Sequence, residues 1–178
     1  MDLFLDRMTS PIGVLRLVWS GTAGQAALRM LDLHGDDGLE RALERHYGPC
    51  RLVPAAAPPE IREPLEAYFA GDVTAIDRIP VDAGGTPFQR QVWAALRRIP
   101  AGSTTTYGQL AARIGRPSAC RAVGLANGSN PVAIVVPCHR VIGANGALTG
   151  YGGGLARKRW LLDHERGGAL PFTGEESA

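Results

Sequence analysis

The sequence predicts a mixed α and β protein in two parts, a small antiparallel sheet with helices followed by a mostly helical region. Short apolar runs between turn residues fill the start of the chain, whereas helix-starting signals dominate after Thr86. The segment Asp82-Ala83-Gly84-Gly85 separates the two patterns, and 178 residues suffice for two small domains. We therefore expect a supporting α+β domain over 1–82, a second domain over 86–167 and a mobile tail over 168–178.

The first part begins with strands and continues with helices. The turn Ser10-Pro11-Ile12-Gly13 joins the first two apolar runs and predicts a hairpin. Asp36 or Asp37 is the expected cap of the first helix, and Pro58-Pro59 opens the second. The predicted strands are Leu3–Leu5, Val14–Trp19 and Ala26–Leu33, and the predicted helices are Gly38–Tyr47 and Pro59 to about Gly71.

The second part begins with Thr86-Pro87, a capping residue followed by proline at the first helical position, and this helix ends before Pro100. Two shorter helices, Tyr107–Ile114 and Ala119–Asn127, follow. They are separated by a tight break at Gly115–Ser118, whose serine is the expected cap of the later helix. Such a pair fits a helix-turn-helix or an ordinary helical corner, and the spacing alone favours neither.

A reactive cysteine is predicted near the end of the second part. The apolar run Val132–Val136 predicts a buried strand that Pro137 stops, and Cys138-His139-Arg140 follows at once. A lone cysteine after such a strand is most often a buried packing residue. Here an imidazole and a guanidinium stand next to it, and both favour the nucleophilic thiolate. Because neighbours in a strand point to opposite sides, His139 can serve Cys138 only if the chain turns at Pro137.

A final helix is predicted over Leu155–Glu165. It carries Glu165 into a region that is otherwise poor in carboxylates, so this side chain is the candidate to orient the imidazole of His139.

Charge is divided unevenly along the chain, although its formal net charge is only +2. Residues 1–86 carry 13 acidic and 8 basic side chains, whereas residues 87–178 carry 4 acidic and 11 basic ones. No Asp or Glu occurs from Ala83 to Leu162. A basic second half of this kind is typical of a protein that binds a polyanion, although a chance run of charges remains the alternative.

Several classes are disfavoured by composition. No apolar run approaches the roughly 18 residues of a membrane span, and an acidic start is unlike a signal peptide, so we expect a cytoplasmic protein without a membrane partner. The three cysteines Cys50, Cys120 and Cys138 lack the spacing of a disulfide framework or zinc ribbon. We expect neither a metal nor another cofactor.

The second half resembles the methylated-DNA–protein-cysteine methyltransferases, also called O6-alkylguanine-DNA alkyltransferases, from about Thr86 to Gly167. The first half is similar only in its plan of strands followed by helices. The motifs that carry the resemblance are Thr86-Pro87-Phe88-Gln89, Tyr107-Gly108-Gln109-Leu110-Ala111, Arg121-Ala122-Val123-Gly124, Asn130-Pro131, Pro137-Cys138-His139-Arg140-Val141, Gly150-Tyr151-Gly152-Gly153-Gly154 and Trp160-Leu161-Leu162-Asp163-His164-Glu165.

The resemblance implies a stoichiometric repair reaction on O6-alkylguanine in duplex DNA, with O4-alkylthymine as a further candidate lesion. Cys138 would accept the alkyl group irreversibly, His139 would take its proton through a water, and Glu165 would hold His139. Tyr107 would offset charge on the leaving base, and Asn130 would brace the turn that carries Cys138. The implied walls of the base pocket are Tyr107, Val141, Tyr151, Gly152 and Gly153.

For the rest of the molecule the resemblance implies a ribonuclease H-like first domain and a helix-turn-helix in the second. The helix that starts near Ala119 would lie in the minor groove, and Arg121 would fill the space of the flipped nucleotide. Ser118, Gly124 and Asn127 complete the expected DNA-binding set. We expect a monomer, with cooperative binding on DNA as the alternative to independent binding.

Two departures from the family bear on the site. Gly152 stands where some members have serine, so only a backbone donor is available there. Some members also bind zinc in the first half, where this chain offers only His34, His46 and Cys50, too few for a closed site of four ligands.

Three other functions compete with repair. A damage sensor would flip alkylated bases without transfer, but related sensors lack the acceptor cysteine that Cys138 provides. A helix-turn-helix regulator with Cys138 as a switch would prefer one operator sequence. A Cys-His hydrolase would turn over repeatedly on an ester or amide, and it leaves the basic region unexplained.

Overall fold

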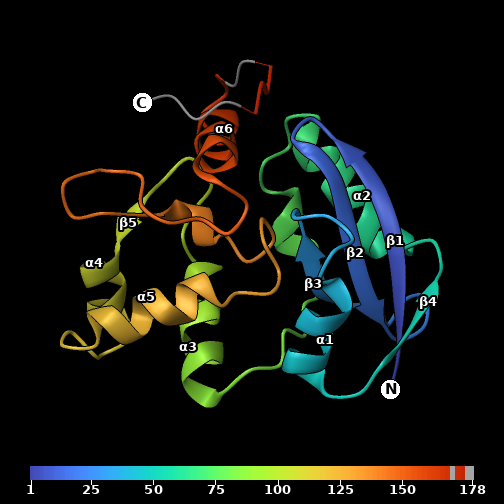
Figure 1. The fold of residues 1–178 in the computed structure, drawn as a ribbon. Helices are drawn as coiled ribbons and strands as arrows, with labels where there is room; N and C mark the ends of the chain where they lie inside the picture. The colour runs from blue at the N-terminus through green and yellow to red at the C-terminus, as the bar shows by residue number, and fades with distance from the viewer. Residues whose placement is uncertain (169–170, 175–178) are drawn as a thin grey trace. The chain divides into compact units, whose positions relative to one another are not determined.

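The computed structural model describes residues 1–168 and 171–174 (Figure 1), so part of the predicted tail lies outside the described residues. The chain forms two compact units. One comprises Met1–Gly85 together with Pro131–Val135, and the other comprises Thr86–Asn130 and the chain from Val136 onward. Both strands and helices are present, as the α+β prediction requires. In the described part of the chain, no helix combines the length and the apolarity that crossing a membrane requires.

A four-stranded sheet organises the first unit, in the order β3-β2-β1-β4 (Figure 1). The predicted hairpin is present, since β1 pairs antiparallel with β2. The prediction of a purely antiparallel sheet is wrong, because β4 runs parallel to β1 and the sheet is mixed. The strands are β1 (Asp2–Ser10), β2 (Gly13–Ser20), β3 (Ala27–Asp32) and β4 (Arg51–Pro54), and the helices are α1 (Leu39–Tyr47), α2 (Pro59–Phe69) and the 3₁₀ turn η1 (Ala75–Arg78).

The two faces of this sheet carry different helices. Leu5 of β1 and its partner Val18 of β2 share a core cluster with Leu39 and Leu43, so α1 covers their face. Asp6 points to the opposite face because side chains alternate along a strand. Its carboxylate accepts a 2.8 Å hydrogen bond from Arg62 of α2, which therefore lies on the other side.

The predicted aspartate cap of α1 is wrong. The N-cap is Gly38, with a φ of 89°, and it makes no side-chain cap bond. The carboxylate of Asp36 instead accepts hydrogen bonds from Arg7 and Arg16, at 2.9 and 2.8 Å. Two guanidinium groups of the sheet thus compete for the side chain that the sequence pattern assigns to the helix.

The strand predicted over Val132–Val136 is also wrong. Only Val132 makes a bridge, to Leu31 of β3, and the chain then turns so that the amide of Val135 bonds to the carbonyl of Ala133 at 2.8 Å. Ile134 has a φ of 72°, rare for a β-branched residue. The run is buried as expected, but burial of a short apolar run does not specify an extended backbone.

Helices dominate the second unit, with a two-stranded parallel sheet beside them. The indole of Trp93 donates a 2.8 Å hydrogen bond to the carbonyl of Ala126 and so ties α3 to α5. The elements are α3 (Pro87–Leu96), β5 (Thr105–Thr106), α4 (Tyr107–Arg113), α5 (Cys120–Gly128), the 3₁₀ turn η2 (Cys138–Arg140), β6 (Val141–Ile142) and α6 (Leu155–Glu165).

The start signals of these helices had different outcomes. Thr86 forms a capping box with Gln89, which confirms the predicted start of α3. Ser118 does not cap α5, whose N-cap is Ala119 without a side-chain bond. A turn closed by the amide of Ala119 and the carbonyl of Arg116, 2.9 Å apart, leads into this helix instead.

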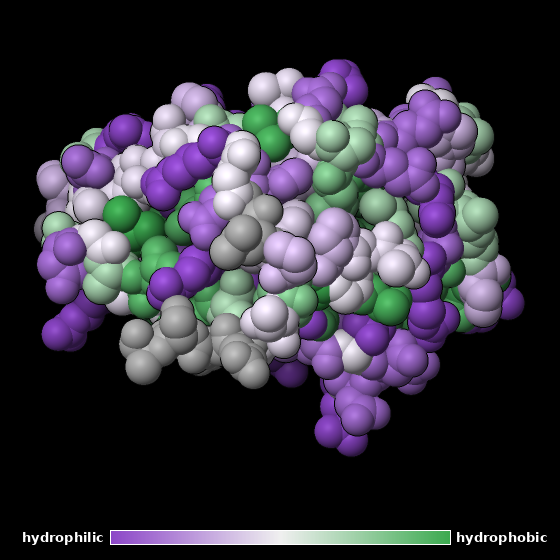
Figure 2. Space-filling view, turned by 90° about the horizontal axis from the view of Figure 1, so that it is seen from above, coloured by the Kyte–Doolittle hydropathy of each residue, from purple (hydrophilic) through white to green (hydrophobic). Residues whose placement is uncertain are grey.

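On the face drawn in Figure 2, areas of hydrophobic residues alternate with hydrophilic side chains. Among the large hydrophobic residues of the described chain, Leu125 of α5 is the most exposed, at 77%.

Candidate active site

The turn at Pro137 that the cysteine hypothesis requires is present. Pro137 precedes the 3₁₀ turn η2, in which the amide of Arg140 bonds to the carbonyl of Pro137 at 3.0 Å. The amide of Cys138 bonds to the carbonyl of Val136 at 2.8 Å, and the side-chain amide of Asn130 donates to that same carbonyl at 2.8 Å. The backbone is therefore folded here, and the strand alternation that would separate Cys138 from His139 does not apply.

The imidazole of His139 is held by Glu165. Nε2 of His139 lies 2.6 Å from Oε1 of Glu165, and both side chains are fully buried. Burial by itself would raise the pKa of Glu165, but His139 and Arg140 outweigh it and lower this pKa far below its ordinary value. Glu165 is therefore an anion that can only accept, and Nε2 of His139 carries the proton.

The other ring nitrogen of His139 is the basic one. Burial lowers the pKa of His139, only partly offset by Glu165, so the ring is neutral. With Nε2 protonated, Nδ1 carries a free lone pair. This Nδ1 is buried and has no hydrogen-bond partner among the described residues. His139, the residue next to Cys138, therefore has a basic nitrogen whose lone pair is not used by another group among the described residues.

The thiol of Cys138 needs such a base. Cys138 is buried, and burial raises its pKa, while Asn130 and Lys158 act in the opposite direction. The net effect keeps the resting group a thiol at neutral pH. The raised pKa of the thiol and the lowered pKa of the imidazole both oppose proton transfer in the resting protein, so the proton stays on sulfur until a substrate reacts.

Arg140 was expected only as a cation that favours the thiolate of Cys138, but its guanidinium binds Glu165 instead. Its Nε and Nη2 donate to the two oxygens of Glu165, at 2.9 and 2.8 Å, and Nη1 donates to the carbonyl of Ile99 at 2.6 Å. The two hydrogen bonds from the guanidinium fix the orientation of the Glu165 carboxylate, and the positive charge of Arg140 compensates its buried negative charge. Its position two residues after the cysteine was the available signal.

Lys158 of α6 is a site residue that sequence reasoning missed. It is completely buried, and its Nζ donates to the carbonyls of Val141 and Thr149, both at 2.7 Å. Burial lowers its pKa, whereas the nearby Cys138 raises it. It is the only lysine in a chain with 18 arginines, which was the available signal.

The remaining predicted pocket residues come from three elements. Tyr107 begins α4, and its hydroxyl accepts a 3.3 Å hydrogen bond from Oγ1 of Thr149. Val141 is buried in β6, where it pairs with Thr105 of β5. The hydroxyl of Tyr151 is buried without a partner among the described residues, and burial raises its pKa well above the ordinary value. Gly152 and Gly153 follow it in the segment before α6.

The residues predicted to meet DNA lie in and before α5. Arg121 is exposed in the first turn of this helix, and Ser118 is exposed in the preceding turn. Ala119 and Gly124 are partly exposed. Asn127 differs from them because it is buried at the end of α5, so its side chain does not belong to the exposed face of the helix.

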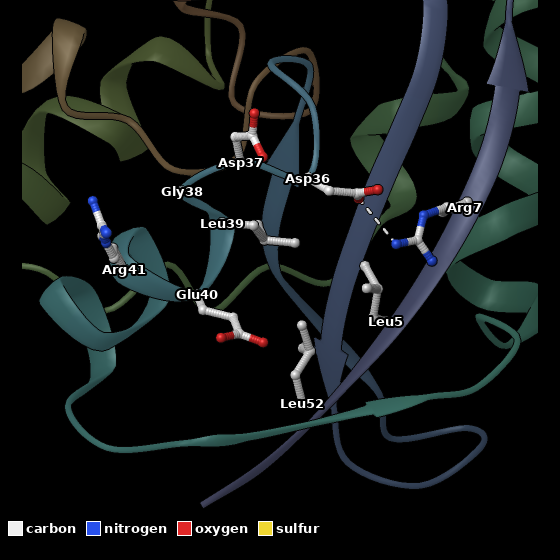
Figure 3. Close-up of a pocket in the computed structure, with 9 residues that line it drawn as sticks. All are labelled: Leu5, Arg7, Asp36, Asp37, Gly38, Leu39, Glu40, Arg41 and Leu52. Carbon is white, nitrogen blue, oxygen red and sulfur yellow. Dashed lines mark hydrogen bonds and ion pairs between the residues drawn. The ribbon is translucent and has the colours of Figure 1, made fainter.

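A pocket of about 480 Å³ lies in the first unit (Figure 3). Figure 3 shows Asp36 directed at Arg7, and their atoms are 2.9 Å apart. The lining contains no histidine, cysteine, serine or threonine, so it offers no nucleophile with a base. The lining residues are Leu5, Arg7, Asp36, Asp37, Gly38, Leu39, Glu40, Arg41 and Leu52.

Comparisons with known proteins identify the family of the chain. Residues 87–167 match the family described as 6-O-methylguanine DNA methyltransferase, DNA binding domain. A methylated-DNA–protein-cysteine methyltransferase from Salmonella typhimurium is 49% identical over 168 residues, covering 93% of this chain and 96% of the relative. The relative of the same name from Mycobacterium tuberculosis is 49% identical over 160 residues, covering 88% of each chain.

The structure is also similar to solved structures of proteins from this family. The crystal structure of Mycobacterium tuberculosis OGT in complex with DNA has a TM-score of 0.74 and 42% identity, and it covers 95% of each chain. The methyltransferase of Pyrococcus kodakaraensis shares the fold with a TM-score of 0.64 at 24% identity, covering 92% of this chain and 98% of the other. The resemblance predicted from the motifs is confirmed, and the chain belongs to the methylated-DNA–protein-cysteine methyltransferase family.

Proposed function

We propose that this protein repairs DNA by transferring the alkyl group of O6-alkylguanine to Sγ of its own Cys138, once per molecule. One observation carries the proposal beyond family membership. Cys138 adjoins a buried His139 whose Nε2 is bound to Glu165, which leaves Nδ1 as a buried base without a partner among the described residues. O4-alkylthymine is a second candidate lesion with the same kind of alkyl–oxygen bond.

The reaction follows from these groups. Nδ1 of His139 takes the thiol proton, through a water, and Glu165 stabilises the imidazolium without becoming protonated. The thiolate then forms a sulfur–carbon bond as the carbon–O6 bond breaks, and that electron pair moves onto the base. Guanine gains one proton as the thiol loses one, so charge balances, and the hydroxyl of Tyr107 stabilises the charge during departure.

The thioether product explains the single turnover. A thioether sulfur is not a leaving group under these conditions, so nothing regenerates Cys138. The same argument separates repair from the hydrolase alternative, in which an acyl-cysteine would be released by water.

Base flipping belongs to the proposal because the buried thiol cannot reach a stacked base. The pair α4 and α5 would act as a helix-turn-helix with α5 in the minor groove, and the exposed Arg121 would fill the gap. Ser118, Ala119 and Gly124 would contact the backbone around it.

The wider architecture is proposed on similar grounds. The order β3-β2-β1-β4, with only β4 parallel to β1, supports a ribonuclease H-like first domain. We place the domains at 1–82 and 86–167, with the tail 168–178 beyond them, and the segment Pro131–Val135 of the second range belongs by its contacts to the first unit. The three free cysteines suit a reducing cytoplasm, and a single copy supplies every proposed catalytic group, so a monomer suffices.

The decisive experiment incubates the protein with a duplex that contains one O6-methylguanine and follows both partners by mass spectrometry. We expect the Cys138 peptide to gain one methyl while the lesion becomes guanine, with a yield that never exceeds one per protein. The Cys50 and Cys120 peptides are internal controls and should stay unmodified. An intact lesion with unmodified Cys138 would refute the proposal.

A further inference from the structure

The segment between β6 and the glycines before α6 forms a closed loop, residues 143–149. The amide of Gly143 bonds to the carbonyl of Ala147 and the amide of Gly146 to that of Gly143, both at 2.9 Å. The amide of Ala147 also bonds to the side chain of Asn145 at 3.1 Å. These internal bonds give the loop a defined shape, although much of it is exposed.

Lys158 fastens both ends of this loop. Its Nζ donates to the carbonyl of Val141, just before the loop, and to the carbonyl of Thr149, at its end, both at 2.7 Å. Both acceptors are neutral, so an ion pair does not explain the burial of this ammonium group. Burying a cation is costly. A lysine that is fully buried to bind two backbone oxygens therefore indicates that their positions matter.

The side chain of Thr149 is oriented by the same loop. Gly143 has so little space that a Cβ there would come within 3.4 Å of the methyl carbon of Thr149. The methyl carbon of Thr149 thus lies on the Gly143 side, and a β-branched side chain has few alternative rotamers, so the direction of the hydroxyl is restricted. That hydroxyl donates to the hydroxyl of Tyr107 at 3.3 Å.

We propose that Thr149 is a positioning residue for the hydroxyl of Tyr107, and that Lys158 holds Thr149 in place for this purpose. The inference rests on the proposed function, in which Tyr107 donates to the leaving guanine. A phenol has one proton and can accept as well as donate. When Thr149 fills an acceptor position, the proton of Tyr107 is directed away from the loop and remains available to the base.

The test is a double-mutant cycle on the rate of methyl transfer. Thr149→Val keeps the shape and removes the donor, and Thr149→Ser keeps the donor. Each is measured in the wild-type and Tyr107→Phe backgrounds, under single-turnover conditions with a duplex that contains O6-methylguanine. Thr9→Val, at an exposed threonine of β1, is the matched control.

We expect Thr149→Val to slow transfer roughly 3- to 10-fold, the value of one hydrogen bond, with duplex affinity unchanged within about twofold. Thr149→Ser should restore most of the rate, and Thr9→Val should match the wild type. In the Tyr107→Phe background, Thr149→Val should change the rate by less than about twofold, because its partner is gone.

An equal loss in both backgrounds would mean that Thr149 acts only on loop structure, and it would overturn the inference. Wild-type rates for Thr149→Val would overturn it as well. Failure of the proposed function looks different, since the wild-type protein itself would then leave Cys138 unmodified. Lys158→Met also removes a charge that acts on the thiol of Cys138, so Thr149→Val is compared in the wild-type and Lys158→Met backgrounds. It should change the rate of the folded Lys158→Met protein by less than about twofold, and an undiminished loss would show that Lys158 does not act through Thr149.

Discussion

Oε1 of Glu165 lies 2.6 Å from Nε2 of His139, inside a region where both side chains are fully buried. Arg140 binds the same carboxylate with two nitrogens, so its orientation is fixed from a second direction. The pair thereby assigns the proton to Nε2 and the lone pair to Nδ1 before any substrate binds. The first prediction concerns the charge of this carboxylate.

Glu165→Gln should slow methyl transfer by about 10²- to 10⁴-fold, the usual contribution of a positioned base, because the amide stabilises neither the tautomer nor the imidazolium. The single-turnover rate with an O6-methylguanine duplex measures this. Asp163→Asn, on the same helix, is the matched control and should transfer at the wild-type rate. Loss of charge also leaves Arg140 buried without its anion, at a cost of about 3–5 kcal/mol, so the fraction folded is measured first by circular dichroism. A wild-type rate in the folded Glu165→Gln protein would remove His139 from the mechanism.

The transfer rate should be independent of pH from about pH 7 to 8.5 and should fall at lower pH. Burial keeps the pKa of His139 below its ordinary value of 6.5, so the neutral base persists until the medium is clearly acidic. Rates measured across this range distinguish the base from a free thiolate. If a pre-formed thiolate were the nucleophile without a base, the rate would instead rise about tenfold per pH unit below the thiol pKa.

Stability should also fall as the pH is lowered. A histidine whose pKa is lower in the folded protein than in the unfolded chain binds its proton preferentially when unfolded. Its contribution is complete above pH 6.5 and is lost as the pH falls through the folded pKa, and Glu165 adds a further loss at more acidic pH. Urea unfolding at pH 7.5 and 5.5 measures the difference. A protein that is more stable at pH 5.5 would contradict a buried neutral His139.

Arg121→Ala should slow repair of duplex DNA at least about tenfold while leaving repair of a single-stranded oligonucleotide nearly unchanged. The side chain would offset the cost of extruding the nucleotide, which is a few kcal/mol in a duplex and much smaller in a single strand. Arg113→Ala, an exposed arginine of α4, is the control. It should weaken binding to lesion and undamaged duplexes alike and reduce the salt dependence. If Arg121→Ala slowed repair of duplex and single-stranded substrates equally, Arg121 would not act by filling the space of the flipped nucleotide.

Methylation of Cys138 should destabilise the protein. The residue is 7% exposed, so an added methyl group must displace packed neighbours, at a cost of about 1–3 kcal/mol. For a chain of this size each kcal/mol corresponds to roughly 2–4 °C in melting temperature. Calorimetry of the protein before and after one equivalent of lesion measures the shift. An unchanged or higher melting temperature would mean that the site already has room for the product.

Local signals in the sequence predicted those elements whose cause is local. Thr86 and Gln89 close a capping box within one turn of helix, and the helix Leu155–Glu165 has the predicted bounds. The side-chain cap expected from Asp36 failed because Arg7 and Arg16, distant in sequence, bind the same carboxylate. A pattern confined to neighbouring residues contains no information about such competitors.

The candidate site likewise combines residues that local motifs predicted with contacts that depend on residues distant in sequence. The reactive set Cys138, His139 and Glu165 was expected from motifs, but a turn at Pro137 could only be postulated. The contacts that make it work come from far along the chain, such as that of Arg140 with Ile99, 41 residues away. Lys158 illustrates the limit, since nothing local distinguishes a lysine that binds two carbonyls from one that faces water.

The short segment Pro131–Val135 has a consequence for the order in which the protein is made. It belongs by its contacts to the first unit, where the amide of Leu31 bonds to the carbonyl of Pro131, although about 45 residues of the second unit precede it in the chain. During synthesis the first unit therefore cannot complete its fold until residue 135 has left the ribosome. Cys138, the proposed acceptor, follows three residues later, so a growing chain completes its first unit and gains this cysteine almost together.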